Sequence, residues 1–86
     1  MQESIGEYIG KRVLELREHR DLTQKELAEA SGVPQPNISR LERGVLEDVN
    51  VSTLLGLAHA LRVKPQTLLP ERIPSPRRPR PKEVAV

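Results

Sequence analysis

The first stretch of the chain carries apolar side chains at the spacing of an amphipathic helix. They recur every three or four residues, the period at which side chains share one face of an α-helix. Ser4 and Glu7 have the capping-box spacing, in which each side chain satisfies a backbone N–H of the first turn. The pattern predicts a helix from about Ser4 to His19 or Arg20. Its inward positions are Ile5, Ile9, Val13 and Leu16.

The next stretch predicts two short helices joined by a tight turn. Thr23 and Glu26 form a second capping box, so the first of these helices begins there. It ends near Gly32, because glycine tolerates the left-handed backbone conformation in which a chain reverses. The second helix begins near the prolines that follow, and Gly44 is placed to end it. The corner and the inward face of this second helix are formed by Val33, Ile38 and Leu41.

A longer helix and a short one complete the periodic part of the chain. Asn50 is a suitable N-cap for the longer helix, and Arg62 follows its last apolar position. Pro65 favours the first turn of a short helix that reaches Leu69, because an N–H would be unpaired there in any case. The predicted apolar face of the longer helix is Val51, Leu54, Leu57, Ala58 and Leu61.

The composition changes at Pro70. Five of the last seventeen residues are proline, and apolar periodicity is absent there. Such a segment buries too little apolar surface to fold, so we expect an extended or disordered tail. The predicted organisation is one domain, residues 1–69, with the two-helix motif at about 23–44, and a flexible basic Pro/Arg-rich tail, residues 70–86.

Composition restricts the domain to a small aliphatic core. Tyr8 is the only aromatic residue, and cysteine is absent, which excludes disulfides and thiolate metal sites. A chain of 86 residues forms one domain at most, and a core of Leu, Val, Ile and Ala suits short helices. The predicted fold class is all-α, with five helices.

No set of residues for catalysis is apparent. His19 and His59 are isolated, and the sequence has neither a glycine-rich phosphate loop nor a carboxylate cluster. We therefore expect no enzyme activity, no cofactor and no metal. No apolar run is long enough to span a membrane, and the N-terminus lacks the features of a signal peptide, so a cytoplasmic protein is expected.

The positive charge of the chain is unevenly distributed. The net charge is +2, but residues 1–69 hold nine Lys/Arg against ten Asp/Glu, and residues 70–86 hold five against two. The net charge of the domain is therefore no argument for a nucleic-acid partner. Only the placement of individual charges can support one.

The residues around the turn have a spacing that resembles one family. The small residue Ala28 precedes Gly32 by four positions, and apolar residues follow five, ten and thirteen positions after Ala28. This pattern resembles the helix-turn-helix of the phage-repressor/Cro (XRE) family, whose second helix enters the major groove of DNA. Residues 9–13 and 54–61 also look like the first and fourth helices of that family. The resemblance covers about residues 5–69 and implies a compact five-helix, phage-repressor-like fold.

The resemblance also implies which residues contact DNA. The position of Gln24 contacts a phosphate in the family, at a helix N-terminus whose free N–H groups favour an anion. The positions of Gln35, Pro36 and Arg40 are the main base-contacting ones; glutamine suits adenine and arginine suits guanine. Pro36 departs from the pattern, because its side chain can only touch a thymine methyl or set the angle of the first turn. The candidate DNA-binding residues are Gln24, Gln35, Pro36, Asn37, Ser39, Arg40 and Arg43.

The roles of three of these candidates are less specific. Asn37 and Ser39 are expected at phosphates or flanking bases. Arg43 either contacts the DNA backbone or only offsets the dipole at the end of its helix. For every one of these residues the alternative is an ordinary solvated helix face.

Two further features follow from comparison with the family pattern. Its members pair an arginine late in the first helix with a glutamate late in the third, and Arg17 and Glu42 match both positions, so we expect a partly buried ion pair. The loop after the third helix carries Glu47 and Asp48, where phage repressors often have basic residues. Either this loop is held away from DNA, or the tail compensates for weaker binding.

The function that the resemblance implies is a sequence-specific regulator of transcription, a repressor more readily than an activator. The expected partner is double-stranded DNA with an inverted-repeat operator. One reading helix covers few base pairs, so a homodimer is expected. The sequence does not separate a phage or plasmid repressor from a restriction-modification controller or an antitoxin.

A protein-interaction module on the same fold is the alternative function. The low net charge of the domain and its acidic loop favour it, whereas Gln24, Gln35 and Arg40 favour DNA. The tail segment 77–82, RRPRPK, is open to three interpretations: contact with the DNA backbone or minor groove, binding to a protein partner, or solubilisation.

Overall fold

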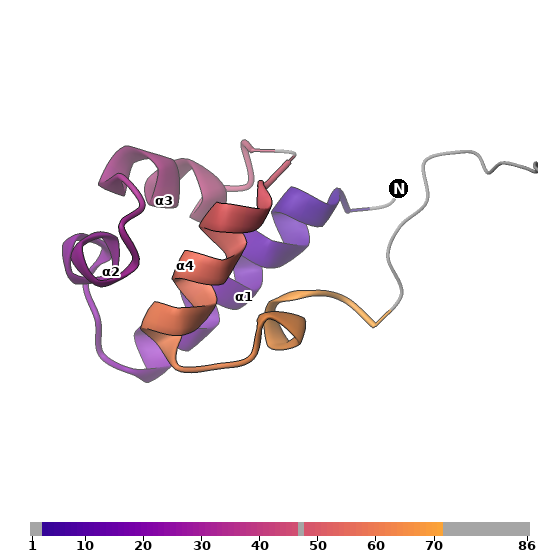
Figure 1. Ribbon diagram of the computed structural model, residues 1–86. Helices are drawn as coiled ribbons and strands as arrows, with labels where there is room; N and C mark the ends of the chain where they lie inside the picture. The colour runs from indigo at the N-terminus through magenta and orange to yellow at the C-terminus, as the bar shows by residue number, and fades with distance from the viewer. Residues whose placement is uncertain (1–2, 47, 72–86) are drawn as a thin grey trace, which may run out of the picture.

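The computed structural model describes residues 3–46 and 48–71 (Figure 1). This part is helical and contains no strand, which confirms the all-α prediction. The fifth predicted helix is a single 3-10 turn, in which Thr67 N–H donates to the Lys64 carbonyl at 2.9 Å. Residues 72–86 of the predicted tail, and Glu47, lie outside the described residues. The elements are α1 (Ile5–His19), α2 (Gln24–Ser31), α3 (Gln35–Glu42), α4 (Val51–Leu61) and η1 (Pro65–Leu68).

The starts of α1, α2 and α4 are fixed by the predicted caps. Ser4 Oγ accepts from Glu7 N–H at 3.0 Å, and Glu7 Oε1 accepts from Ser4 N–H at 2.8 Å. Thr23 and Glu26 form the same reciprocal pair at the start of α2. Asn50 Oδ1 accepts from Thr53 N–H at 2.8 Å at the start of α4. Since each cap uses residues close together in the chain, the sequence was enough to predict them.

A residue with left-handed backbone conformation ends or follows each of the four α-helices, and after α1 it is Asp21, with φ of 57°. Gly32 and Gly44, with φ of 78° and 79°, occupy the positions predicted for glycine. Arg62 ends α4 with φ of 61°, in a conformation that costs a residue with a Cβ about 1–2 kcal/mol. The chain thus reverses after α4 at a residue that carries a Cβ, where glycine would adopt the same conformation at lower cost.

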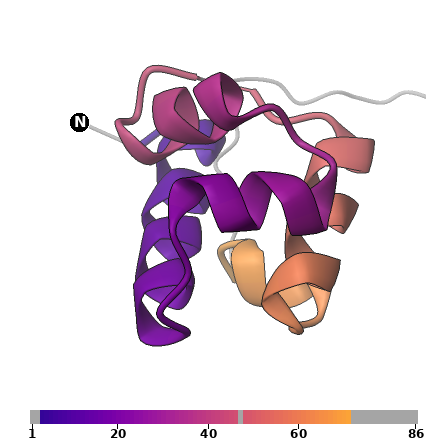
Figure 2. The same cartoon turned by 90° about the vertical axis from the view of Figure 1, so that its left-hand side faces the viewer.

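The core lies where α1, α3, α4 and η1 meet under α2. Figure 2 shows α2 crossing in front, between α1 and α4. One sequence prediction was wrong here: Val51 is 68% exposed, because it lies at the edge of the α4 stripe and in the first turn of the helix. The buried apolar residues are Ile9, Val13, Leu27, Val33, Ile38, Leu41, Leu57, Ala58, Leu61 and Leu68.

Two glycines allow helices to approach backbone to backbone. A Cβ on Gly10 of α1 would lie 1.9 Å from the carbonyl oxygen of Leu41 in α3. A Cβ on Gly56 of α4 would lie 2.7 Å from the carbonyl oxygen of Ser31, the last residue of α2. These contacts fix the two helices of the turn motif against α1 and α4. Among the described residues, no helix is both long and apolar enough to cross a membrane.

Candidate nucleic-acid interface

Helix α3 buries a narrow stripe and exposes the rest of its surface. Only Ile38 and Leu41 are buried in it, three residues apart. Gln35, Pro36 and Arg40 are exposed, as is Arg43 directly after the helix, and Asn37 and Ser39 are partly exposed. Every α3 residue that the sequence suggested for DNA contact therefore lies outside the core.

The start of α3 offers few free backbone donors. No side chain caps it, Pro36 has no N–H, and the Asn37 N–H already donates to the Pro34 carbonyl at 2.9 Å. An anion at this helix end would therefore meet fewer N–H groups than at an ordinary helix N-terminus. Side chains have to supply the polar contacts of α3.

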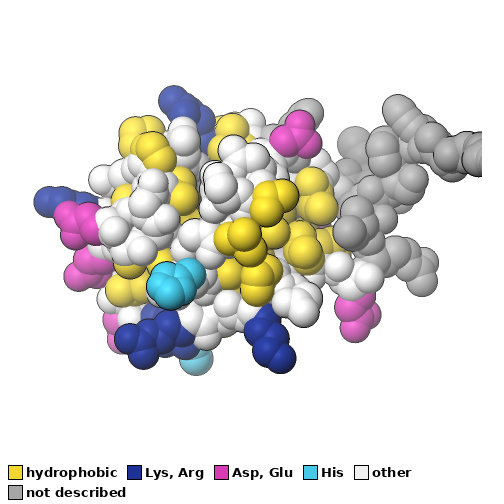
Figure 3. All heavy atoms as spheres, viewed as in Figure 1, with side chains coloured by type: hydrophobic (Ala, Val, Ile, Leu, Met, Phe, Trp, Pro, Cys, Tyr) yellow, Lys and Arg dark blue, Asp and Glu magenta, His cyan; other side chains and the backbone are white. Residues whose placement is uncertain are grey.

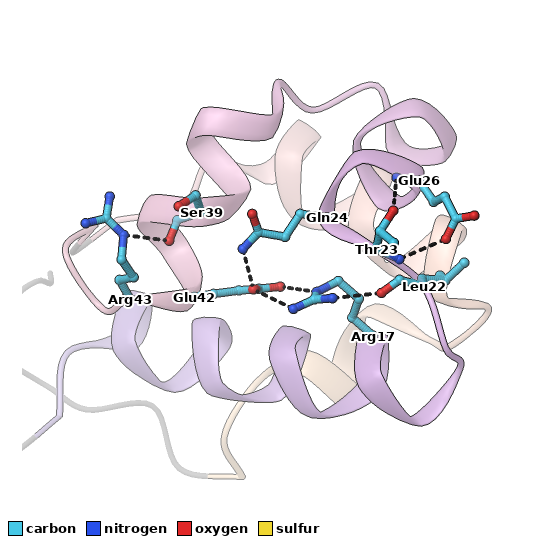
Figure 4. A network of polar contacts seen from close by, with 8 residues as sticks. All are labelled: Arg17, Leu22, Thr23, Gln24, Glu26, Ser39, Glu42 and Arg43. Atoms are coloured by element: carbon cyan, nitrogen blue, oxygen red, sulfur yellow. Dashed lines mark hydrogen bonds and ion pairs between the residues drawn. The ribbon is translucent and has the colours of Figure 1, made fainter.

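Two arginines on the outer surface are hydrogen-bonded within their own segment. Arg40 Nη1 donates to Asn37 Oδ1 at 2.8 Å. Arg43 Nε donates to the Ser39 carbonyl oxygen at 3.4 Å (Figure 4). Both guanidinium groups keep further N–H donors, since arginine carries five.

Arg17 and Glu42 lie in contact, as Figure 4 shows. Arg17 Nε donates to Glu42 Oε2 at 2.7 Å, and Nη2 donates to Oε1 at 3.1 Å, a two-point arrangement of the strong kind. The remaining nitrogen, Nη1, donates to the Leu22 carbonyl at 2.7 Å. The pair therefore joins α1 to the end of α3 and also holds the α1–α2 link.

The surroundings of this pair are largely dry. The Arg17 and Glu42 side chains are 13% and 4% exposed. The hydrogen bond to Glu42 raises the pKa of the Arg17 guanidinium above its usual value, although burial acts in the opposite direction. Glu42 is the only acidic residue of α3, so its pairing leaves Arg40 and Arg43 as the charges on the outer surface.

Gln24 lies at the junction of α2 and α3. Its Nε2 donates to Glu42 Oε1 at 2.9 Å, so the amide of the first α2 residue is fixed to the end of α3 (Figure 4). The second N–H of this amide and its Oε1 have no partner recorded among the described side chains. The predicted phosphate contact of Gln24 stays a prediction.

The loop between α3 and α4 borders a hollow of about 150 Å³. Leu46 and Val49 pack against the core, whereas Val45 is 57% exposed. Of the two acidic loop residues, Asp48 is exposed and lines the hollow, and Glu47 lies outside the described residues. The residues that line it are Val33, Asn37, Leu41, Leu46, Asp48, Val49, Asn50 and Thr53.

Sequence reasoning missed the bonds from Arg17 and Arg43 to backbone carbonyls and two contacts between side chains. The Asn37–Arg40 bond had a signal, because residues three apart on a helix are neighbours. The Gln24–Glu42 bond had none, since it joins residues eighteen apart through the packing of two helices. In the described part of the chain, no group of three or more His, Asp or Glu residues is arranged to hold a metal ion.

The packed pair of helices α2 and α3, joined by the turn at Gly32, defines a helix-turn-helix domain. The helix-turn-helix family HTH_3 matches residues 13–68. The chain belongs to this family, which confirms the resemblance to the XRE type, and it has the fold of helix-turn-helix transcription regulators.

Several solved structures are similar to the chain. The restriction-modification controller protein C.AhdI from Aeromonas hydrophila is 34% identical, over 74% of this chain and 96% of its own, with a TM-score of 0.70. The clp gene regulator ClgR from C. glutamicum is 31% identical, over 78% and 86%, with a TM-score of 0.71. SinR, a master regulator for biofilm formation solved in complex with DNA, is 30% identical, over 70% and 95%, with a TM-score of 0.67. A comparison with curated protein sequences gave no match.

Proposed function

We propose that this chain is a sequence-specific double-stranded DNA-binding regulator of transcription. It binds as a homodimer and places α3 in the major groove of an inverted-repeat operator. The observation that carries the proposal is the outer surface of α3, where Gln35 and Arg40 are exposed on a helix fixed to α1 through Arg17 and Glu42. Side chains of these two types recognise adenine and guanine edges in the major groove.

Local charge supports DNA as the partner in spite of the domain's net charge. Arg40 and Arg43 face outward, and the one carboxylate of α3 is paired with Arg17 and Gln24. Cations at phosphates supply most of the non-specific affinity of a DNA-binding protein. The arrangement therefore concentrates positive charge at the surface proposed to meet the duplex. SinR, which was solved in complex with DNA, has the same fold.

An exposed apolar surface supports the homodimer. Val45, Val51 and Leu55 are 57%, 68% and 49% exposed, and Figure 3 shows hydrophobic side chains gathered over α4. Val45 comes two residues after Arg43 at the end of α3, and Val51 and Leu55 lie one turn apart on α4. A second copy that binds here covers the patch and presents both α3 helices to one duplex, as two half-sites require.

Repression is the simplest mode of regulation for this architecture, because it requires no contact beyond DNA binding. A dimer that occupies an operator excludes other proteins from the same DNA by its volume alone. Activation would require a further contact with the transcription machinery, and no residue of the described part is assigned to one.

Selection of binding sites from a random duplex pool tests the proposal. Wild type and the Gln35→Ala/Arg40→Ala double variant are compared at near-physiological salt. We expect wild type to enrich an inverted repeat and the variant to lose it, because each good base contact contributes about 1–3 kcal/mol of discrimination. Absence of enrichment, or binding that is equally weak and equally salt-sensitive in both proteins, would contradict the proposal.

A protein-interaction module, such as an antitoxin, is the second candidate. Exposed Asp48 beside α3 and the net charge of −1 over residues 1–69 favour it, since both weaken attraction to phosphate. If the selection fails, this function becomes the preferred one. The tail segment 77–82 then becomes the first region to test for a protein partner.

A further inference from the structure

We infer that Asn37 is a positioning residue for Arg40 and that the pair selects a guanine in each half-site of the operator. The inference rests on the proposed function. It adds that the base recognised is guanine and that Asn37 orients the arginine that recognises it. It starts from the hydrogen bond of 2.8 Å between Arg40 Nη1 and Asn37 Oδ1, on the outer surface of α3.

Asn37 is the anchored member of the pair. It is partly buried and lines the hollow between α3 and α4 beside Leu41 and Thr53. Arg40 is exposed, and among the described residues its guanidinium group has no hydrogen bond other than the one to Asn37. The bond therefore restrains the arginine through the asparagine.

The restraint leaves the arginine able to recognise guanine. Guanine presents O6 and N7 in the major groove, and a guanidinium binds both with two N–H groups. Arginine has five N–H donors, so four remain after the bond to Asn37. A long side chain that is already oriented loses less rotamer freedom when it binds, which strengthens the correct contact more than misaligned ones.

The same bond limits what Asn37 itself can read. Two-point recognition of adenine uses the acceptor oxygen and the donor nitrogen of one amide together. Asn37 Oδ1 already accepts from Arg40, so one of its two lone pairs is used and the orientation of the amide is tied to the arginine, while its NH₂ group suits a phosphate oxygen. Pro36, next to it, has no polar side-chain atom. Base discrimination by α3 therefore depends on Gln35 and on Arg40 as held by Asn37.

Competition binding with pairs of duplexes tests this inference. The wild-type chain first selects its operator, and each half-site guanine is then replaced in a matched duplex. Arg40→Ala is expected to reduce the preference for the guanine duplex by about 5- to 150-fold. Asn37→Ala is expected to reduce it by at least ~2-fold, the lower limit for coupled neighbours. Loss of the Asn37 NH₂ group should weaken binding to every duplex by the same factor, so the readout is the ratio of affinities for the two matched duplexes. The unfolding midpoint should be unchanged in Asn37→Ala.

Two further variants separate positioning from a direct contact. In the Arg40→Ala background, Asn37→Ala should have no additional effect on base preference, because its partner is absent. Asn37→Asp should retain the guanine preference, since it keeps an acceptor oxygen for Arg40, while its negative charge weakens binding to every duplex.

The outcomes that overturn the inference differ from those that overturn the proposed function. An unchanged guanine preference in Asn37→Ala, or an equal loss in both backgrounds, refutes the positioning role while wild type still binds its operator. A selected operator whose guanines do not depend on Arg40 refutes the assignment of the base. If wild type enriches no duplex, the proposed function fails, and the inference fails with it.

Discussion

Glu42 receives hydrogen bonds from side chains on two other helices. Arg17 of α1 gives two and Gln24 of α2 gives one. A carboxylate side chain that is 4% exposed has lost nearly all its water and needs hydrogen-bond donors in place of that water. The end of α3 is therefore located by charge and hydrogen bonding as well as by the two apolar residues beneath it.

Breaking this pair should destabilise the domain strongly. We expect Arg17→Met or Glu42→Leu to lower the free energy of unfolding by about 3–5 kcal/mol, because each change leaves a buried charge without its partner. Urea unfolding followed by circular dichroism measures the effect.

Two comparisons control this prediction. The double variant Arg17→Met/Glu42→Leu should recover much of the loss, since no lone charge remains. Lys11→Met removes the exposed ion pair between Lys11 and Glu3, and should change stability by no more than about 1 kcal/mol. Single variants of Arg17 and Glu42 that unfold like wild type would mean that the pair contributes nothing.

At the scale of single residues, the sequence predicted which residues take part in the ion pair, but it did not predict most of the other side-chain contacts. Arg17 and Glu42 were suggested by resemblance to a family, and the structure brings them together with the expected geometry. The bonds from Gln24 and Arg40 depend on which rotamer each long side chain adopts, and local spacing does not determine this. The DNA contacts of the candidate residues stay predictions.

Among the elements, predictions held where the determining interactions are local. The starts of α1, α2 and α4 follow from caps within three residues of one another. Val51 was wrongly placed in the core. The apolar period shows which side of α4 faces inward, but it does not show how far along that side the neighbouring helices cover it. The close approaches at Gly10 and Gly56 depend on how helices cross, which sequence alone did not reveal.

Gly10→Ala should destabilise the domain, although alanine is the better helix former. Helix propensity favours alanine by about 1 kcal/mol. The new Cβ would nevertheless lie 1.9 Å from the Leu41 carbonyl oxygen, and forcing α1 away from α3 should cost about 1–3 kcal/mol or more. Thermal unfolding should therefore give a lower midpoint.

Glu18→Ala is the matched control, at an exposed position of the same helix. Its stability should lie within about 0.5 kcal/mol of wild type. Gly56→Ala should also be destabilised, and less than Gly10→Ala, because its Cβ would lie 2.7 Å from the facing oxygen. A Gly10→Ala protein more stable than wild type would show that α1 and α3 separate at little cost.

For the whole molecule, the proposed homodimer should depend on the exposed apolar residues Val45, Val51 and Leu55. Val51→Glu and Leu55→Glu should each weaken self-association by about tenfold or more, because a charge would be buried in the contact. Sedimentation over a range of concentrations measures this, and binding to a two-half-site duplex should weaken in parallel.

Ser52→Glu is the control for charge and position. Ser52 lies in the same first turn of α4 as Val51 and is exposed, so the added charge has the same relation to the helix N-terminus but replaces no apolar side chain. Because Ser52 lies three residues before Leu55, Ser52→Glu should weaken association less than either apolar-to-Glu variant. Equal behaviour of all three variants would indicate that another surface forms the dimer.

The narrow buried stripe of α3 has a consequence for divergence between related chains. Only Ile38 and Leu41 are committed to the core, and the helix is fastened at its far end by Glu42. The outward residues can therefore be exchanged without repacking the interior. On the proposed function, a lineage built on this scaffold can acquire new operators by a few surface substitutions that leave the core residues unchanged, so that sister regulators in one cell avoid cross-talk.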